Sequence, residues 1–204
     1  MAAEATSTVG AWQATQPDAA AVWLSGLTVP WWIAGGWALD LFAGSQCRPH
    51  QDLDVGILRR DAPTLLAAFA SWAVFEAKDG TLTRLHAGRQ PRAEVHSLWC
   101  RRAADGPWIL ELMLDEARRE RWLYRRDPAI QAPLTQVIRH AVNGVPYLAP
   151  EVQLLYKARA VRARDQADFD RIAPRLDAAA RTWLHSALAQ AEPKHPWLTV
   201  LRAT

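Results

Sequence analysis

The chain has 204 residues, half of them apolar, and a formal net charge of +3. That length and apolar share suffice to bury the core of about one domain, or one and a half, and the small charge excludes a protein that coats nucleic acid. Apolar runs are all too short for a membrane span. The leader MAAEATSTVG lacks the basic and apolar regions of a signal peptide, so we expect a frayed N-terminus and a cytoplasmic protein.

The first third of the chain predicts helices alternating with short strands. A helix is expected over 15–27, where Pro17 stands in the first turn, and another over 37–44, where Gly44 ends it. A third helix is expected over 61–72, capped by Asp61 and with Pro63 in its first turn. The buried runs PWWIA and LDVGIL, at 30–34 and 53–58, predict strands.

The pattern changes after these elements. Short aromatic or alternating runs separated by turn residues predict the strands of one sheet, over 72–77, 81–87, 93–100, 108–114 and 121–126. Helical patterns follow over 149–163, 165–176 and 178–191, with Asp165 as the N-cap of the second. We therefore predict an α+β fold, a mixed sheet flanked by helices with a helical C-terminal region, and domains 1–127 and 128–204 divided within the proline-rich stretch 128–150.

A glycine pair and two aspartates stand out in this arrangement. Gly35 and Gly36 follow a predicted strand and open a helix, so their backbone N–H groups can approach a phosphate with no Cβ in the way. Asp52 and Asp54 alternate with apolar residues on the next strand and therefore project to one side. Neighbouring carboxylates repel each other unless a cation lies between them, and Mg²⁺ prefers such oxygens.

This ensemble, GGWALDLFAG followed by RPHQDLDVGI, resembles the signature of the DNA polymerase β-like nucleotidyltransferases, most closely the aminoglycoside and lincosamide branch. The tail over 147–176 is similar to a helical segment of bacterial relatives in that branch. The resemblance implies a nucleotidyltransferase fold, Mg²⁺, and transfer of a nucleoside monophosphate from ATP or another NTP to an acceptor hydroxyl with release of pyrophosphate. It also implies metal binding by Asp52 and Asp54, and phosphate binding by Gly35 and Gly36.

The family completes its platform with an acidic residue, commonly an aspartate, from a later strand. Glu111 in WILELML is the candidate for a third metal ligand or a general base, although glutamate is one methylene longer. A carboxylate flanked by buried apolar residues needs a partner or a cation. Asp115 and Glu94 are the rivals, the first interpreted as part of a strand-end turn and the second as an outward partner of an arginine.

Basic residues near these motifs are candidates for binding the triphosphate. Arg48 and His50 precede the aspartates, and either contacts the nucleotide or holds Asp40 of the preceding helix. Lys157 and Arg159 lie on the first helix of the tail, where a basic side chain reaches phosphate in the family. Solvated positions remain the alternative for both.

The sequence thus predicts a Mg²⁺-dependent nucleotidyltransferase whose partners are a nucleotide and an acceptor, a small molecule such as an aminoglycoside. Two alternatives stay open: a toxin-type enzyme that modifies protein or tRNA, and a nucleotide-binding protein without catalysis. No membrane partner is expected.

Overall fold

The computed structural model describes residues 10–202, so nearly all of the predicted leader lies outside the described residues. Packing divides the chain into two compact units. The first unit contains residues 10–33 and 48–117, and the second contains 34–47 and 118–202. This division concerns packing and not independent folding, so the predicted boundary between residues 127 and 128 remains a prediction.

The first unit combines one sheet with two helices and a 3-10 turn. Its elements in chain order are α1 (Pro17–Leu24), β1 (Trp31–Ile33), β2 (Asp54–Leu58), η1 (Arg59–Asp61), α3 (Ala62–Ala68), β3 (Ala73–Lys78), β4 (Thr81–Arg84), β5 (Ser97–Arg101) and β6 (Leu110–Arg118). The strand order is β4-β3-β5-β6-β2-β1. Strands β2 and β6 are parallel, whereas the other neighbours are antiparallel, which confirms the predicted mixed sheet.

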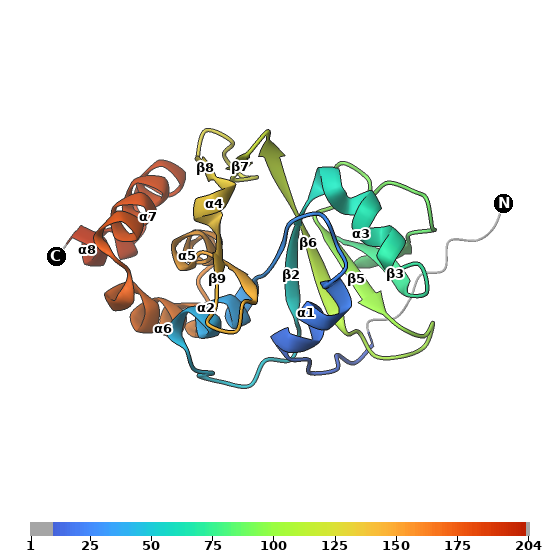
Figure 1. Ribbon diagram of the computed structural model, residues 1–204. Coiled ribbons are helices and arrows are strands. Elements are labelled where there is room, and N and C mark those ends of the chain that lie inside the picture. Colours follow the sequence, from blue (N-terminus) through green and yellow to red (C-terminus); the bar gives the residue numbers. More distant parts are fainter. Residues whose placement is uncertain (1–9, 203–204) are drawn as a thin grey trace. The chain divides into compact units, whose positions relative to one another are not determined.

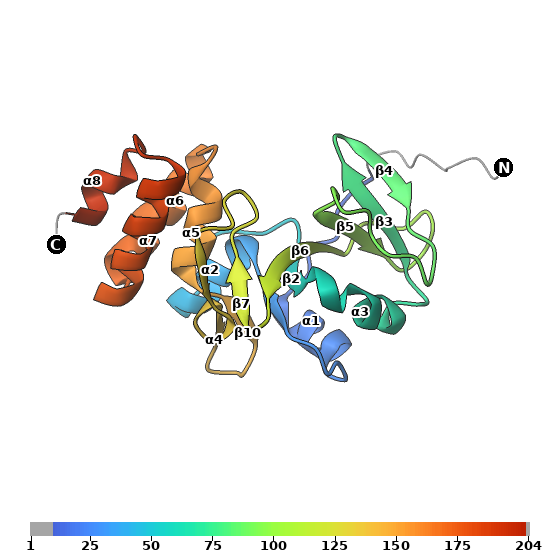
Figure 2. The ribbon, with the colours of Figure 1, turned by 90° about the horizontal axis from the view of Figure 1, so that it is seen from above.

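The helices of this unit lie on one face of its sheet. Figures 1 and 2 show α1 and α3 on the same side, and Trp23 of α1 packs edge-on against Trp72 at 5.2 Å between ring centroids. Along β2, Val55 and Ile57 are fully buried, as is Leu112 on β6. The sheet centre is therefore held by aliphatic side chains, which fix the strands that carry the acidic residues.

A second, aromatic cluster belongs to the same unit. Trp12 forms a bridge with Trp108, and Trp99 contacts both rings at centroid distances of 4.9 and 5.4 Å. The register of β3 and β5 pairs Trp99 with Phe75, and Phe75 also packs edge-on against Trp108. These three tryptophans thus pack with one another as part of the hydrophobic core, as is usual for large aromatic side chains.

The second unit is mainly helical, with two short hairpins. Its elements are α2 (Gly35–Ala43), β7 (Arg121–Leu123), β8 (Gln131–Pro133), α4 (Leu134–Val137), β9 (Ile138–His140), β10 (Pro146–Leu148), α5 (Pro150–Ala158), α6 (Ala163–Ile172), η2 (Ala173–Arg175), α7 (Ala178–Ala191) and α8 (Trp197–Arg202). Strands β7 and β8 pair, as do β9 and β10. Helix α2 packs against α5 and α6 (Figure 1). The predicted helical C-terminal region and the α+β class are confirmed.

Three local predictions need correction. Asp61 occupies the N-cap position of α3 but makes no side-chain capping bond. Asp165 is not the N-cap of α6: Arg162 is, and Asp165 accepts the Arg162 backbone N–H at 3.1 Å. Asp115 lies within β6, 6% exposed, rather than in a turn at its end. No described helix is long and apolar enough to cross a membrane.

Candidate functional site

The aspartate pair lies at the start of β2, where burial alternates residue by residue. Asp52 is exposed, Leu53 is fully buried, Asp54 is half-buried and Val55 is fully buried. Successive residues of an extended chain point to opposite sides, so the burial of Leu53 and Val55 on one side directs both carboxylates to the other. The sequence pattern LDV therefore fixes where these carboxylates point.

Glu111 lies directly opposite Asp54 on the neighbouring strand. The register of the parallel strands β2 and β6 pairs Asp54 with Glu111, and the Glu111 backbone N–H donates to the Leu53 carbonyl at 2.9 Å. Paired residues of neighbouring strands, about 4.8 Å apart, project from the same face of the sheet. The structure thus brings the side chains of Asp54 and Glu111 next to each other, from positions 57 residues apart.

A hydroxyl group that sequence reasoning missed contacts this pair. The Ser97 hydroxyl donates to Glu111 Oε1, with an O–O distance of 2.6 Å. Ser97 is the first residue of β5, and Glu111 is registered with Trp99, two residues further along that strand. Only the register reveals the contact, because nothing in the local sequence distinguishes Ser97 from an ordinary strand residue.

The rival carboxylates have other surroundings. Asp115 is registered with Leu58, at the far end of β2 from Asp54. Glu94 is about half exposed and pairs with Lys78 at 4.0 Å. Of the three candidates for the third carboxylate, Glu111 is therefore the one that lies opposite an aspartate of the pair.

The basic loop before β2 is internally connected. Arg48 Nη1 lies 3.1 Å from His50 Nδ1, and His50 is 6% exposed.

In the second unit, Asp40 pairs with Arg171 at 2.5 Å and accepts the Cys47 backbone N–H at 3.3 Å. Arg171 is thus a partner of Asp40 that the sequence analysis did not consider.

The glycine pair opens α2 as predicted, but one of its amides already has an acceptor. Gly35 has a φ of +65°, a conformation that glycine adopts readily and other residues rarely do. Its N–H donates to Gln153 Oε1 on α5 at 2.7 Å, and Gln153 is 7% exposed. The first N–H groups of a helix need acceptors, and for Gly35 that acceptor is a side chain. Phosphate binding by Gly36 remains a prediction.

Lys157 lies in a buried ion-pair network. Its ammonium group is 2.8 Å from Asp165 Oδ1 and 3.0 Å from Asp168 Oδ2, and its side chain is 8% exposed. Burial raises the pKa of Asp165, but hydrogen bonds from Arg162 and Lys157 outweigh burial and hold that pKa well below its ordinary value. This arrangement gives Lys157 a structural role between α5 and α6, because a phosphate would have to displace two carboxylates.

The donor set around Asp54 suits a small divalent cation. No group of three or more His, Cys, Asp and Glu residues between 10 and 202 is arranged to hold a metal ion by itself. Mg²⁺ does not need such a group, since one or two carboxylates commonly hold it while water and substrate phosphates complete its octahedron. The adjacent carboxylates of Asp54 and Glu111 fit that requirement.

Comparison with known proteins places this arrangement in context. The model of the family described as aminoglycoside-2″-adenylyltransferase matches residues 20–172. No curated protein matches the chain. Among solved structures, the lincosamide antibiotic adenylyltransferase LnuA, bound to lincomycin, is 12% identical with a TM-score of 0.54, over 80% of this chain and 98% of LnuA. ANT(2″)-Ia in complex with adenylyl-2″-tobramycin is 17% identical with a TM-score of 0.46, over 89% of this chain and 90% of that one.

The likeness to LnuA shows a shared nucleotidyltransferase-type fold, as the sequence predicted. The family match covers well over half of the chain, including α2, the aspartate pair and Glu111. The chain belongs to the aminoglycoside-2″-adenylyltransferase family.

Proposed function

We propose that the protein is a Mg²⁺-dependent adenylyltransferase that moves AMP from ATP to a hydroxyl group of an aminoglycoside-like molecule. The observation that carries this proposal is the pairing of Asp54 with Glu111 across the parallel strands β2 and β6. Family membership supports ATP as the donor and an antibiotic as the acceptor.

Asp54 and Glu111 would hold the cation together, while Asp52, which is exposed and precedes β2, stays a predicted further ligand. A Mg²⁺ ion held by these residues would supply positive charge to offset that of the triphosphate. The buried neighbours Leu53, Val55 and Leu112 keep the carboxylates in place before substrate arrives. Such preorganisation favours the transition state because little reorganisation is needed during reaction.

Transfer consists of a single exchange of bonds at phosphorus. The acceptor hydroxyl oxygen forms a bond to the α-phosphorus, the bond from the α-phosphorus to the bridging oxygen of the β-phosphate breaks, and pyrophosphate leaves. In this proposal Glu111 either accepts the hydroxyl proton or shares the cation, in which case the proton passes to solvent. Arg48 would contact the triphosphate, since a guanidinium has five N–H donors and its contact with His50 is compatible with phosphate binding.

The test is transfer of label from α-labelled ATP to a panel of aminoglycosides, lincosamides and tRNA in the presence of Mg²⁺. We expect labelled aminoglycoside and pyrophosphate from the wild type, and a loss of at least about 100-fold in Asp54→Asn, because one removed electrostatic contact costs roughly that much in rate. Glu94→Gln is the matched control, since its carboxylate is exposed and lies on no strand of the site.

Other outcomes would refute the proposal in recognisable ways. Label on tRNA or on protein would indicate the toxin-type alternative. Binding of ATP without pyrophosphate release, for every acceptor offered, would indicate a nucleotide-binding protein without catalysis.

A further inference from the structure

We propose that Ser97 is a positioning residue that holds the Glu111 carboxylate toward the cation shared with Asp54. The inference rests on the proposed function, because it assumes that Glu111 is a metal ligand. It concerns a residue of β5 that no sequence motif of the site includes.

The contact is a diagonal one across an antiparallel strand pair. Glu111 is registered with Trp99, and Ser97 with Met113, so Ser97 and Glu111 occupy diagonal positions on the same face. Diagonal neighbours are about 7–8 Å apart in such a pair, which only a long side chain spans. The O–O distance of 2.6 Å lies in the range of a hydroxyl bound to a charged carboxylate.

The diagonal geometry gives a reason for glutamate at this position. An aspartate is shorter by one methylene, about 1.5 Å of reach, and at residue 111 it would fall short of the Ser97 hydroxyl. The family commonly has an aspartate as its third acidic residue, whereas Glu111 is longer and more flexible. The Ser97 hydroxyl compensates for that flexibility by fixing one conformation of the longer side chain.

Trp99 lies beside Glu111 and limits the space in which the Glu111 side chain can move. It is the residue registered with Glu111 on β5, so its side chain adjoins Glu111 on the same face, and its ring packs edge-on against Trp12 and Trp108. Asp54 flanks Glu111 on the opposite strand. Because a carboxylate oxygen has two lone pairs, a bond from Ser97 to Oε1 is compatible with cation binding by the same carboxylate.

Holding the ligand in place beforehand should strengthen cation binding. A glutamate that is free to rotate loses conformational entropy when it binds a metal, and a hydrogen-bond partner removes part of that loss in advance. Partners that orient metal ligands typically change metal affinity or activity by about 10–100-fold when they are removed.

The test measures Mn²⁺ binding by electron paramagnetic resonance in the absence of ATP, with Asp54→Asn defining binding elsewhere on the protein. We expect Ser97→Ala to weaken site-specific binding by about 10-fold and Ser97→Thr, which keeps the hydroxyl, to remain close to the wild type. Glu111→Asp should make Ser97 irrelevant, so adding Ser97→Ala to it should cause no further loss.

Two results would overturn the inference while leaving the proposed function intact: unchanged Mn²⁺ affinity in Ser97→Ala, or an equal loss from Ser97→Ala in the wild-type and Glu111→Asp backgrounds. If the wild type bound no more Mn²⁺ than Asp54→Asn does, both proposals would be overturned. Thermal unfolding of each variant without metal identifies a general folding defect, and Ser97→Thr keeps the test valid if Ser97→Ala unfolds.

Discussion

Trp32 packs directly against Gly56, its registered partner on the neighbouring strand. A Cβ added to Gly56 would lie 2.0 Å from the Trp32 indole nitrogen, and the indole is fully buried. Gly56 is two residues after Asp54 on the same face of β2, so this contact fixes the strand that carries the proposed cation ligand. The indole occupies the space that any larger residue at position 56 would need.

We expect Gly56→Ala to destabilise the protein by about 1–3 kcal/mol, because a methyl group would overpack a rigid, buried ring. Thermal or urea unfolding measures the change. Gly26→Ala is the control, since a Cβ at Gly26 would meet nothing within 4 Å. Equal stability of the two variants would show that Trp32 moves aside easily.

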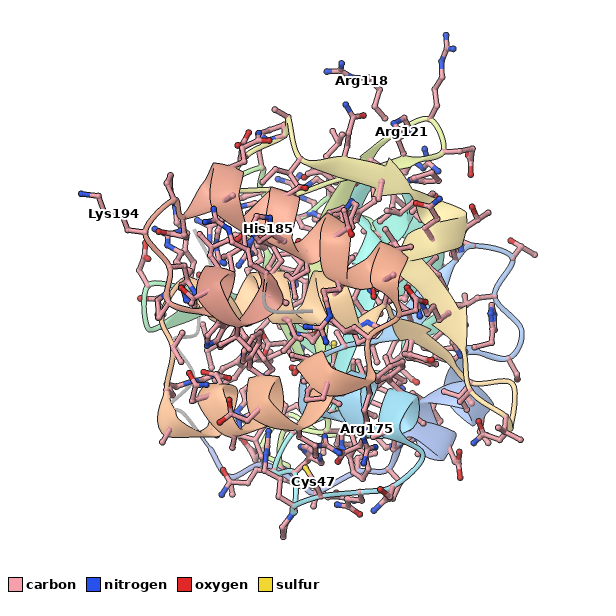
Figure 3. All side chains as sticks on the ribbon, turned by 90° about the vertical axis from the view of Figure 1, so that its left-hand side faces the viewer. Cys47, Arg118, Arg121, Arg175, His185 and Lys194 are labelled. Atoms are coloured by element: carbon pink, nitrogen blue, oxygen red, sulfur yellow. The ribbon has the colours of Figure 1, made fainter. Side chains whose placement is uncertain are left out.

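The buried network of Lys157 gives a second prediction. Lys157→Met removes the cation from between Asp165 and Asp168, and breaking a buried ion pair by removing one partner typically costs about 3–5 kcal/mol. The free energy of unfolding should fall by that amount. Lys194→Met should leave it unchanged, because Lys194 is exposed and extends away from the ribbon in Figure 3.

A different result would restore the phosphate-binding interpretation of Lys157. If Lys157→Met kept the stability of the wild type and only weakened ATP binding, the lysine would serve the nucleotide and the ion pairs would be dispensable.

Asp165 predicts how stability depends on pH. Burial opposes the charge of Asp165, but bonds from Arg162 and Lys157 prevail and lower its pKa in the folded chain. The unfolded chain, with an ordinary pKa of about 3.9, therefore binds the proton first. The stabilisation is fully present above about pH 4–5 and is lost as pH falls toward the lowered pKa.

Asp165→Asn isolates this contribution. The difference in unfolding free energy between wild type and variant should be largest near neutral pH and should shrink below about pH 4, because a protonated Asp165 resembles asparagine. Urea unfolding at several pH values measures it. A difference that stayed constant down to pH 3 would contradict the assigned ion pairs.

The helices and strands with clear periodicity were predictable from sequence. The buried run LDVGIL, for instance, correctly predicted the strand β2. Gly44, for example, ends α2 with a φ of +74°, as its position after a helical run predicts. Stretch 128–150 was less predictable. Its strands β8, β9 and β10 are three residues each, too short for hydrophobic alternation to reveal.

The candidate site was predictable in its residue types but not in its contacts. Local pattern identified Asp52, Asp54 and Glu111, since charged residues between buried ones are conspicuous. Long-range partners were missed: the Gln153 side chain that binds the Gly35 amide is 118 residues away, and Ser97 contacts Glu111 through strand register. The resemblance makes Lys157 a candidate phosphate ligand, but the local pattern does not reveal its carboxylate partners, which lie on the next helix.

The most direct test of the central claim is anomalous diffraction from a crystal grown with ATP and Mn²⁺ in place of Mg²⁺. We predict a Mn²⁺ peak bound by the carboxylates of both Asp54 and Glu111, at a coordination distance slightly above the 2.0–2.1 Å typical of Mg²⁺, and contacting phosphate oxygens. A peak held by ATP alone, with both carboxylates turned to other partners, would contradict the proposal.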